Sequence, residues 1–169
     1  MSGVAAPLAL FLAVVLLTAA AHKLVARDRL AAAAARLAGV SPALGQPLSF
    51  AAAAVEAGAG LALVLPTARP AGALVAALLW SAYTVLLLRA HRAGRAFDCG
   101  CSFGSQAKVA SLYPANRAGM LAGLAAIAVV LPAAMPGVLD LFAALAFFAL
   151  YLAAGELAAV PSTVRSVAR

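Results

Sequence analysis

Apolar residues fall into five long runs along the chain, and the segments between them are richer in charged residues, proline and glycine. None of the runs alternates apolar and polar residues with a period of two, as the strands of a membrane barrel do. A helix needs about 20 apolar residues to cross a bilayer, and it satisfies its own backbone hydrogen bonds there. The pattern predicts an all-α transmembrane bundle of about five segments, forming one integral membrane domain over residues 1–169. The five segments are 4–21, 48–65, 71–88, 118–134 and 138–160.

The composition supports a membrane protein. Hydrophobic residues make up 66% of the chain and charged residues 10%, whereas typical soluble domains carry about 25% charged residues. The first run could be taken for a signal peptide, because the alanines at 19–21 resemble a cleavage site. However, no basic residue precedes this run, and several follow it, so an uncleaved anchor with an external N-terminus is the better prediction.

The net charge of +7 is informative about topology. If all five runs cross the membrane, eleven of the twelve lysines and arginines lie on one side, and only Arg69 lies on the other. The positive-inside rule then predicts a multi-pass protein of the cell membrane, with the N-terminus outside and the C-terminus in the cytoplasm. The same charges favour anionic lipid headgroups. No basic stripe with interleaved aromatic residues is present, so nucleic acid is not an expected partner.

Cys99 and Cys101 are the only cysteines, and they are separated by Gly100 alone. Two thiols this close can form a disulfide, pass it to a partner, or hold a soft metal. Glycine allows the backbone between them to bend tightly, and a strained small ring would exchange readily. We therefore predict that the two cysteines form a redox pair. The alternative is that they are incidental thiols.

The predicted topology places this pair on the cytoplasmic side, where thiols usually stay reduced. Three explanations are open. The pair works there as a reduced dithiol, the loop folds back into the bundle, or one of the last two apolar runs does not cross. Pro132 and Pro136 bracket the very short connection between those two runs, and proline is typical of a turn or a broken helix there.

Glu56 lies near the middle of the second run, where a carboxylate is costly unless it is neutral or paired. It either handles protons or forms a structural ion pair with a lysine from another helix. Lys23, at the inner end of the first run, could reach Glu56 along its flexible side chain, or could instead meet Glu156. Small residues follow Glu56 at 57–60 and would let another helix approach closely. Glu56 and Lys23 are therefore supporting site candidates.

Other residues give weaker signals. His22 and His91 could join the two cysteines as four metal ligands, but they are far apart in the sequence, and three arginines surround His91. We predict no metal site and interpret both histidines as solvated. Trp80 and Tyr83 are interpreted as lipid-facing or packing aromatics. No cofactor motif is evident; a quinone is the one cofactor considered, although no quinone-site motif is present.

Three local patterns carry a resemblance to a known family. They are AAHKL at 20–24, VEAG at 55–58 and, most specifically, DCGCSFG at 98–104. The chain resembles the methylamine utilisation protein MauE family, which belongs to the DoxX-like membrane proteins. It differs from the family pattern at two points. Ser102 is inserted before Phe103 and Gly104, and an Arg-Asn pair before the next helix stands here in the reverse order, as Asn116-Arg117.

The resemblance implies an accessory role in methylamine metabolism, in maturation of the disulfide-rich small (beta) subunit of methylamine dehydrogenase. It also implies a thioredoxin-like partner similar to MauD and a role in the periplasmic space. The leading interpretation is an accessory protein for thiol-disulfide exchange, either an oxidoreductase itself or an accessory to one, in which Cys99 and Cys101 exchange. The alternative is a non-enzymatic scaffold or small transporter with structural cysteines. A quinone-linked oxidoreductase lies between the two.

Overall fold

The computed structural model describes residues 2–94 and 112–159, and all the regular structure in these two segments is helical. The predicted all-α class is therefore confirmed. The long helices follow from Ala- and Leu-rich sequences, which lose little side-chain entropy in a helix. The elements are α1 (Ser2–Val25), α2 (Arg27–Ala38), a 3-10 turn (Pro42–Leu44), α3 (Gly45–Val64), α4 (Arg69–Arg92), α5 (Tyr113–Val130) and α6 (Val138–Ala159).

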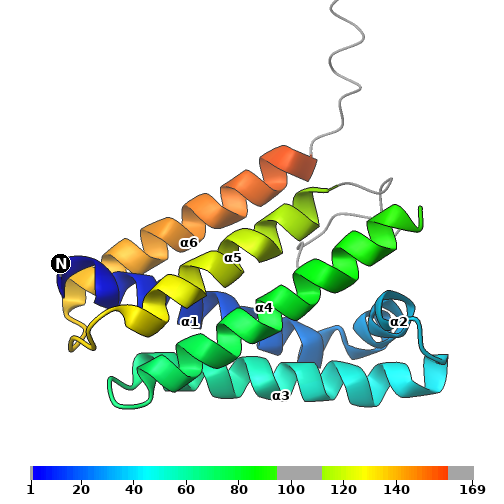
Figure 1. The fold of residues 1–169 in the computed structure, drawn as a ribbon, viewed down its shortest axis with the longest axis horizontal. Coiled ribbons are helices and arrows are strands. Elements are labelled where there is room, and N and C mark those ends of the chain that lie inside the picture. Colours follow the sequence, from blue (N-terminus) through cyan, green and yellow to red (C-terminus); the bar gives the residue numbers. More distant parts are fainter. Residues whose placement is uncertain (1, 95–111, 160–169) are drawn as a thin grey trace, which may run out of the picture.

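The five long helices lie alongside one another in alternating directions, and the short helix α2 lies at one end of the bundle (Figure 1). The sequence analysis assigned no element to α2. Helix α2 packs on α3 and buries Leu30, Ala33 and Ala35, whereas Arg29 and Arg36 are exposed. The helix ends at Gly39, whose φ of 71° is the left-handed conformation that glycine adopts without strain. Helix α2 is thus amphipathic and suited to an interface.

Four of the described helices are long and apolar enough to cross a membrane: α1, α4, α6 and the unit Pro42–Val64, which joins the 3-10 turn to α3. Helix α5 belongs to the same bundle, but it is only 18 residues long and carries Asn116 and Arg117 near its start. The five predicted segments therefore correspond to five bundle helices, four of which meet the requirements for a span. Large apolar side chains are exposed along the bundle, as expected for a surface that faces lipid. The chain is a multi-pass membrane protein.

Helix α1 is the innermost helix and packs against both α3 and α6. Leu12 and Leu16 of α1 are buried in the main core, together with Leu63 of α3 and Trp80 of α4. Glycine allows a close approach between α3 and α4, because a Cβ atom at Gly72 would lie only 2.8 Å from the Cβ of Ala62. The small residues in these helices thus allow the helices to pack closely against one another.

The only described basic residue at the opposite end of the bundle from α2 is Arg69, and it is buried, with 2% of its surface exposed. Its Nε donates a hydrogen bond to the carbonyl of Leu63 (3.2 Å), and its Nη1 donates to the carbonyl of Ala134 (2.8 Å). One side chain therefore ties the α3–α4 turn to the α5–α6 connection. The sequence analysis had used Arg69 only as a topology signal.

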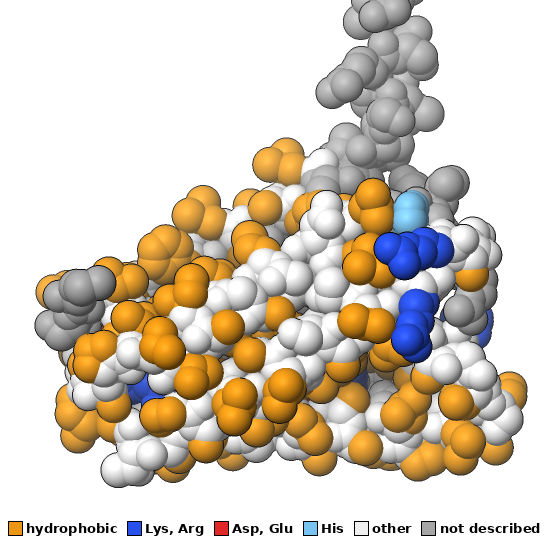
Figure 2. Space-filling model, in the orientation of Figure 1, with side chains coloured by type: hydrophobic (Ala, Val, Ile, Leu, Met, Phe, Trp, Pro, Cys, Tyr) orange, Lys and Arg blue, Asp and Glu red, His pale blue; other side chains and the backbone are white. Residues whose placement is uncertain are grey.

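The other described basic residues gather at the end of the bundle where α2 lies, because each is on α2 or near the matching end of a long helix (Figure 2). They are Lys23, Arg27, Arg29, Arg36, Arg89, Arg92 and Arg117. We call this the basic end. The sequence analysis expected Arg69 on one side of the membrane and the other basic residues on the opposite side. The directions of the helices separate the described basic residues in this way.

Candidate functional site

Lys23 and Glu56 form an ion pair inside the bundle. The Lys23 Nζ lies 2.7 Å from Oε1 and 2.8 Å from Oε2 of Glu56, so it donates to both oxygens of the carboxylate. The last turn of α1 supplies the lysine, and the middle of α3 supplies the glutamate. Only 1% of Glu56 is exposed. Of the two partners that the sequence allowed for Lys23, the structure places Glu56 beside it, and Glu156 is exposed.

Tyr83 of α4 completes this group. Its hydroxyl donates a hydrogen bond of 2.8 Å to Oε1 of Glu56, and its ring centroid lies 5.7 Å from the Lys23 ammonium, within reach of a cation–π interaction. The sequence analysis interpreted Tyr83 as a lipid-facing or packing residue. The sequence feature that could have indicated this role is the position of Tyr83 three residues after Trp80, because residues at this spacing share one face of a helix.

The Glu56 carboxylate thus accepts three hydrogen bonds, two from Lys23 and one from Tyr83. Removing a charge from water is costly, and this cost is offset only where the opposite charge and the hydrogen bonds are well placed. The group joins α1, α3 and α4 at one point. We call these three residues the buried triad.

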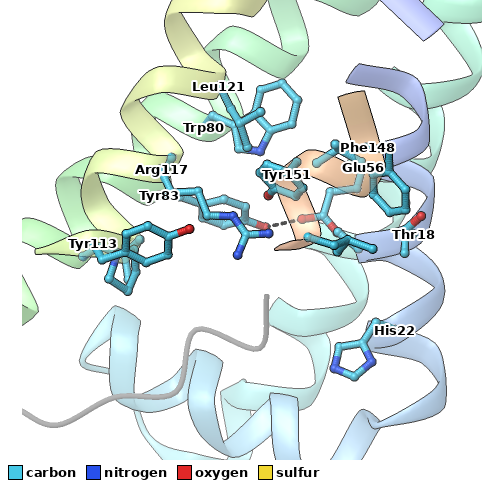
Figure 3. Close-up of a pocket in the computed structure, with 16 residues that line it drawn as sticks. Thr18, His22, Glu56, Trp80, Tyr83, Tyr113, Arg117, Leu121, Phe148 and Tyr151 are labelled. Atoms are coloured by element: carbon cyan, nitrogen blue, oxygen red, sulfur yellow. Dashed lines mark hydrogen bonds between the residues drawn. The ribbon is translucent and has the colours of Figure 1, made fainter. Parts of the chain in front are cut away.

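A cavity of about 60 Å³ adjoins the buried triad and is lined by residues from α1, α3, α4, α5 and α6. One water molecule needs about 10–15 Å³ of such volume, so the cavity has room for several. Figure 3 shows Tyr83 pointing at Glu56, with Arg117, Tyr113 and Tyr151 around the same space. The Glu56 carboxylate therefore lies at a cavity with several polar side chains in its wall, as well as within the ion pair.

Among the described residues that line the cavity, Arg117 of α5 is the one lysine or arginine. Its guanidinium carbon lies 3.9 Å from the ring centroid of Tyr151 on α6, which is a close stacking contact. Its Nε is buried and has no hydrogen-bond partner among the described residues. The sequence analysis treated Arg117 as a topology charge and as half of the reversed Asn-Arg pair, and so it missed this contact between α5 and α6.

Of the remaining candidates, His22 lines the same cavity as Glu56. The Nε2 of His22 lies 3.1 Å from a guanidinium nitrogen of Arg29, and His91 lies in the last turn of α4. In segments 2–94 and 112–159, no three His, Cys, Asp or Glu side chains are grouped so that they could hold a metal ion. Cys99 and Cys101 lie outside the described residues, so their pairing stays a prediction.

The helical bundle and the buried triad define a class: a multi-pass helical membrane protein with an ion-paired carboxylate at the wall of an internal cavity. Residues 1–133 match the family model described as methylamine utilisation protein MauE, and the chain belongs to this family. The match covers α1 to α5 and ends before α6. Membership links the chain to methylamine utilisation. No curated protein and no solved structure matches it.

Proposed function

We propose that the protein is a membrane accessory factor for thiol-disulfide exchange, assisting disulfide formation in an exported protein of methylamine utilisation. The methylamine dehydrogenase small subunit is the substrate we favour, and a thioredoxin-like protein similar to MauD is the partner. The observation that carries the proposal is the cavity beside the buried triad. This cavity extends to the end of α4 and the start of α5. Leu87 of α4, and Tyr113 and Pro114 of α5, line this cavity.

The segment that joins α4 to α5 contains Cys99 and Cys101. In the proposed exchange, the disulfide between them is reduced to two thiols while two substrate thiols become a disulfide, so two electrons and two protons are transferred. The disulfide of the thioredoxin-like partner then reoxidises the pair and is itself reduced. Glu56, held by Lys23 and Tyr83 at the cavity wall, is the carboxylate that would hold or transfer a proton.

Thiol trapping of the membrane-bound protein tests this proposal. Cells are quenched in acid, and free thiols are alkylated with a reagent that adds mass. We expect the oxidised fraction of Cys99 and Cys101 to change when the thioredoxin-like partner is deleted. A redox state that stays fixed with and without the partner would contradict exchange, and would favour a scaffold or transporter with structural cysteines.

The basic end of the bundle gives an orientation to test. We predict that this end faces the cytoplasm and that the N-terminus is outside, because basic residues are retained on the cytoplasmic side. Reporter fusions after Arg36, Lys108 and Arg165 should be active only as cytoplasmic reporters, and a fusion after Arg69 only as an external one. An external signal after Lys108 would overturn this orientation and place the cysteines on the side of an exported substrate.

A further inference from the structure

A long groove runs along the bundle between α5 and α6. In the described part of the chain, both helices pack against α1 but hardly contact each other, so α1 forms the floor of the groove. Its volume is about 830 Å³, and apolar side chains such as Leu8, Phe11, Leu124 and Phe147 line most of its length. Because these helices belong to a membrane bundle, the groove is within reach of lipid acyl chains.

One end of the groove is polar and positively charged. Asn116 and Arg117 line it there, at the basic end of the bundle. The guanidinium of Arg117 crosses from α5 to α6, where it stacks on Tyr151 and lies 3.4 Å from the place where a Cβ atom of Gly155 would be. Its buried Nε has no partner among the described residues. A positive group without a described acceptor thus stands at the head of an apolar groove.

The groove has the length of a lipid. Its lining residues on α5 run from Tyr113 to Ile127, which is about 21 Å along a helix. One leaflet of the hydrocarbon core is about 15 Å thick. An acyl chain can therefore lie along the groove while its headgroup stays near Arg117. A free phosphate ion would leave the apolar length empty, and a zwitterionic headgroup would bring no net charge to Arg117.

We propose that the groove between α5 and α6 is a binding site for one anionic glycerophospholipid, whose phosphate accepts hydrogen bonds from Arg117 and whose acyl chain lies against α1. Arginine suits this role because its planar guanidinium donates two parallel hydrogen bonds to phosphate. Basic pockets between membrane helices are known to bind such headgroups. The site uses neither cysteine, so it is independent of the proposed exchange reaction.

The test measures lipid binding to the full-length protein by native mass spectrometry from detergent. Phosphatidylglycerol and phosphatidylcholine with identical acyl chains are compared, and glycerol 3-phosphate serves as a headgroup without chains. We expect phosphatidylglycerol to bind more tightly than phosphatidylcholine, and glycerol 3-phosphate not to compete. Arg117→Gln should weaken phosphatidylglycerol binding about fivefold, the contribution of one basic residue near a membrane surface.

Matched variants separate the site from general charge and from misfolding. Arg92→Gln removes an exposed charge at the basic end that does not line the groove, and it should leave binding unchanged. Ala154→Trp fills the groove without changing Arg117 and should also weaken binding, whereas Leu78→Trp, on exposed surface of α4, should not. Equal binding of both lipids, or equal losses from Arg117→Gln and Arg92→Gln, would overturn the proposal.

Discussion

Replacing Lys23 with methionine is expected to destabilise the folded bundle by about 3–5 kcal/mol, because it leaves the buried carboxylate of Glu56 without its counter-ion. Only 2% of the Glu56 side chain is exposed, and it lies in the middle of α3. The hydrogen bond from Tyr83 remains in this variant, but it does not neutralise the charge. Reversible unfolding of the purified protein in mixed micelles would give the free energy.

The reciprocal change should cost less. In Glu56→Leu, the ammonium of Lys23 loses its partner, but Lys23 is in the last turn of α1 with 15% of its side chain exposed. Its flexible side chain can therefore move its charge toward the membrane interface. The double variant Lys23→Met with Glu56→Leu should be more stable than Lys23→Met alone, because no unpaired charge remains buried.

Glu156→Gln is the control for these variants, because Glu156 is an exposed carboxylate on α6. It should change the free energy of unfolding by no more than about 0.5 kcal/mol. Tyr83→Phe should cost about 1 kcal/mol, the usual contribution of one hydrogen bond. If the change in unfolding free energy of the double variant equalled the sum of the changes in Lys23→Met and Glu56→Leu, the two charges would not be coupled, and the triad would not be a structural unit.

Substituting either cysteine with serine is expected to abolish the accessory activity. A single thiol can form a mixed disulfide but cannot resolve it, because the second thiol is needed to release the partner. Cys99→Ser and Cys101→Ser should therefore each leave the small subunit misoxidised and scarce in a host that grows on methylamine, and the double variant should be no worse than either single one. Blotting of the small subunit under non-reducing conditions measures this.

Ser102→Ala is the matched control, since it changes the neighbouring residue without touching a thiol. It should support normal small-subunit levels. One of the single serine variants should also accumulate a covalent complex that disappears on reduction. Normal small-subunit levels in the double serine variant would remove the redox proposal and leave a scaffold or transporter role in its place.

The sequence predicted the features of this fold that depend on local composition. Helical class and approximate segment positions follow from the length of the apolar runs, because a helix must satisfy its backbone within one segment. The cost of an intramembrane carboxylate singled out Glu56 and restricted its partners to a few cations. The ion pair with Lys23 was thus accessible from the sequence, although Glu156 remained an alternative partner for Lys23 until the helices were placed.

Features that depend on how the helices are arranged laterally were not accessible. Tyr83 and Arg117 act through helices that are distant in sequence, and an apolar run does not show which of its faces will meet which neighbour. Helix α2 was missed because its buried face is small and consists of only one leucine and two alanines, Leu30, Ala33 and Ala35. The role of Arg69 was missed because its acceptors are backbone carbonyls, which every residue carries.

The central place of α1 bears on how the protein is assembled during synthesis. In α1, 61% of the residues in its most apolar stretch are buried, against 6% in α6. Helix α1 precedes the other described helices in the chain, so it leaves the ribosome before the helices that pack around it. Lys23 is made 33 residues before Glu56, so its ammonium is already at the membrane when α3 inserts. The carboxylate can then enter the hydrocarbon core next to a counter-ion that is already in place, so it is not unpaired in lipid at any stage.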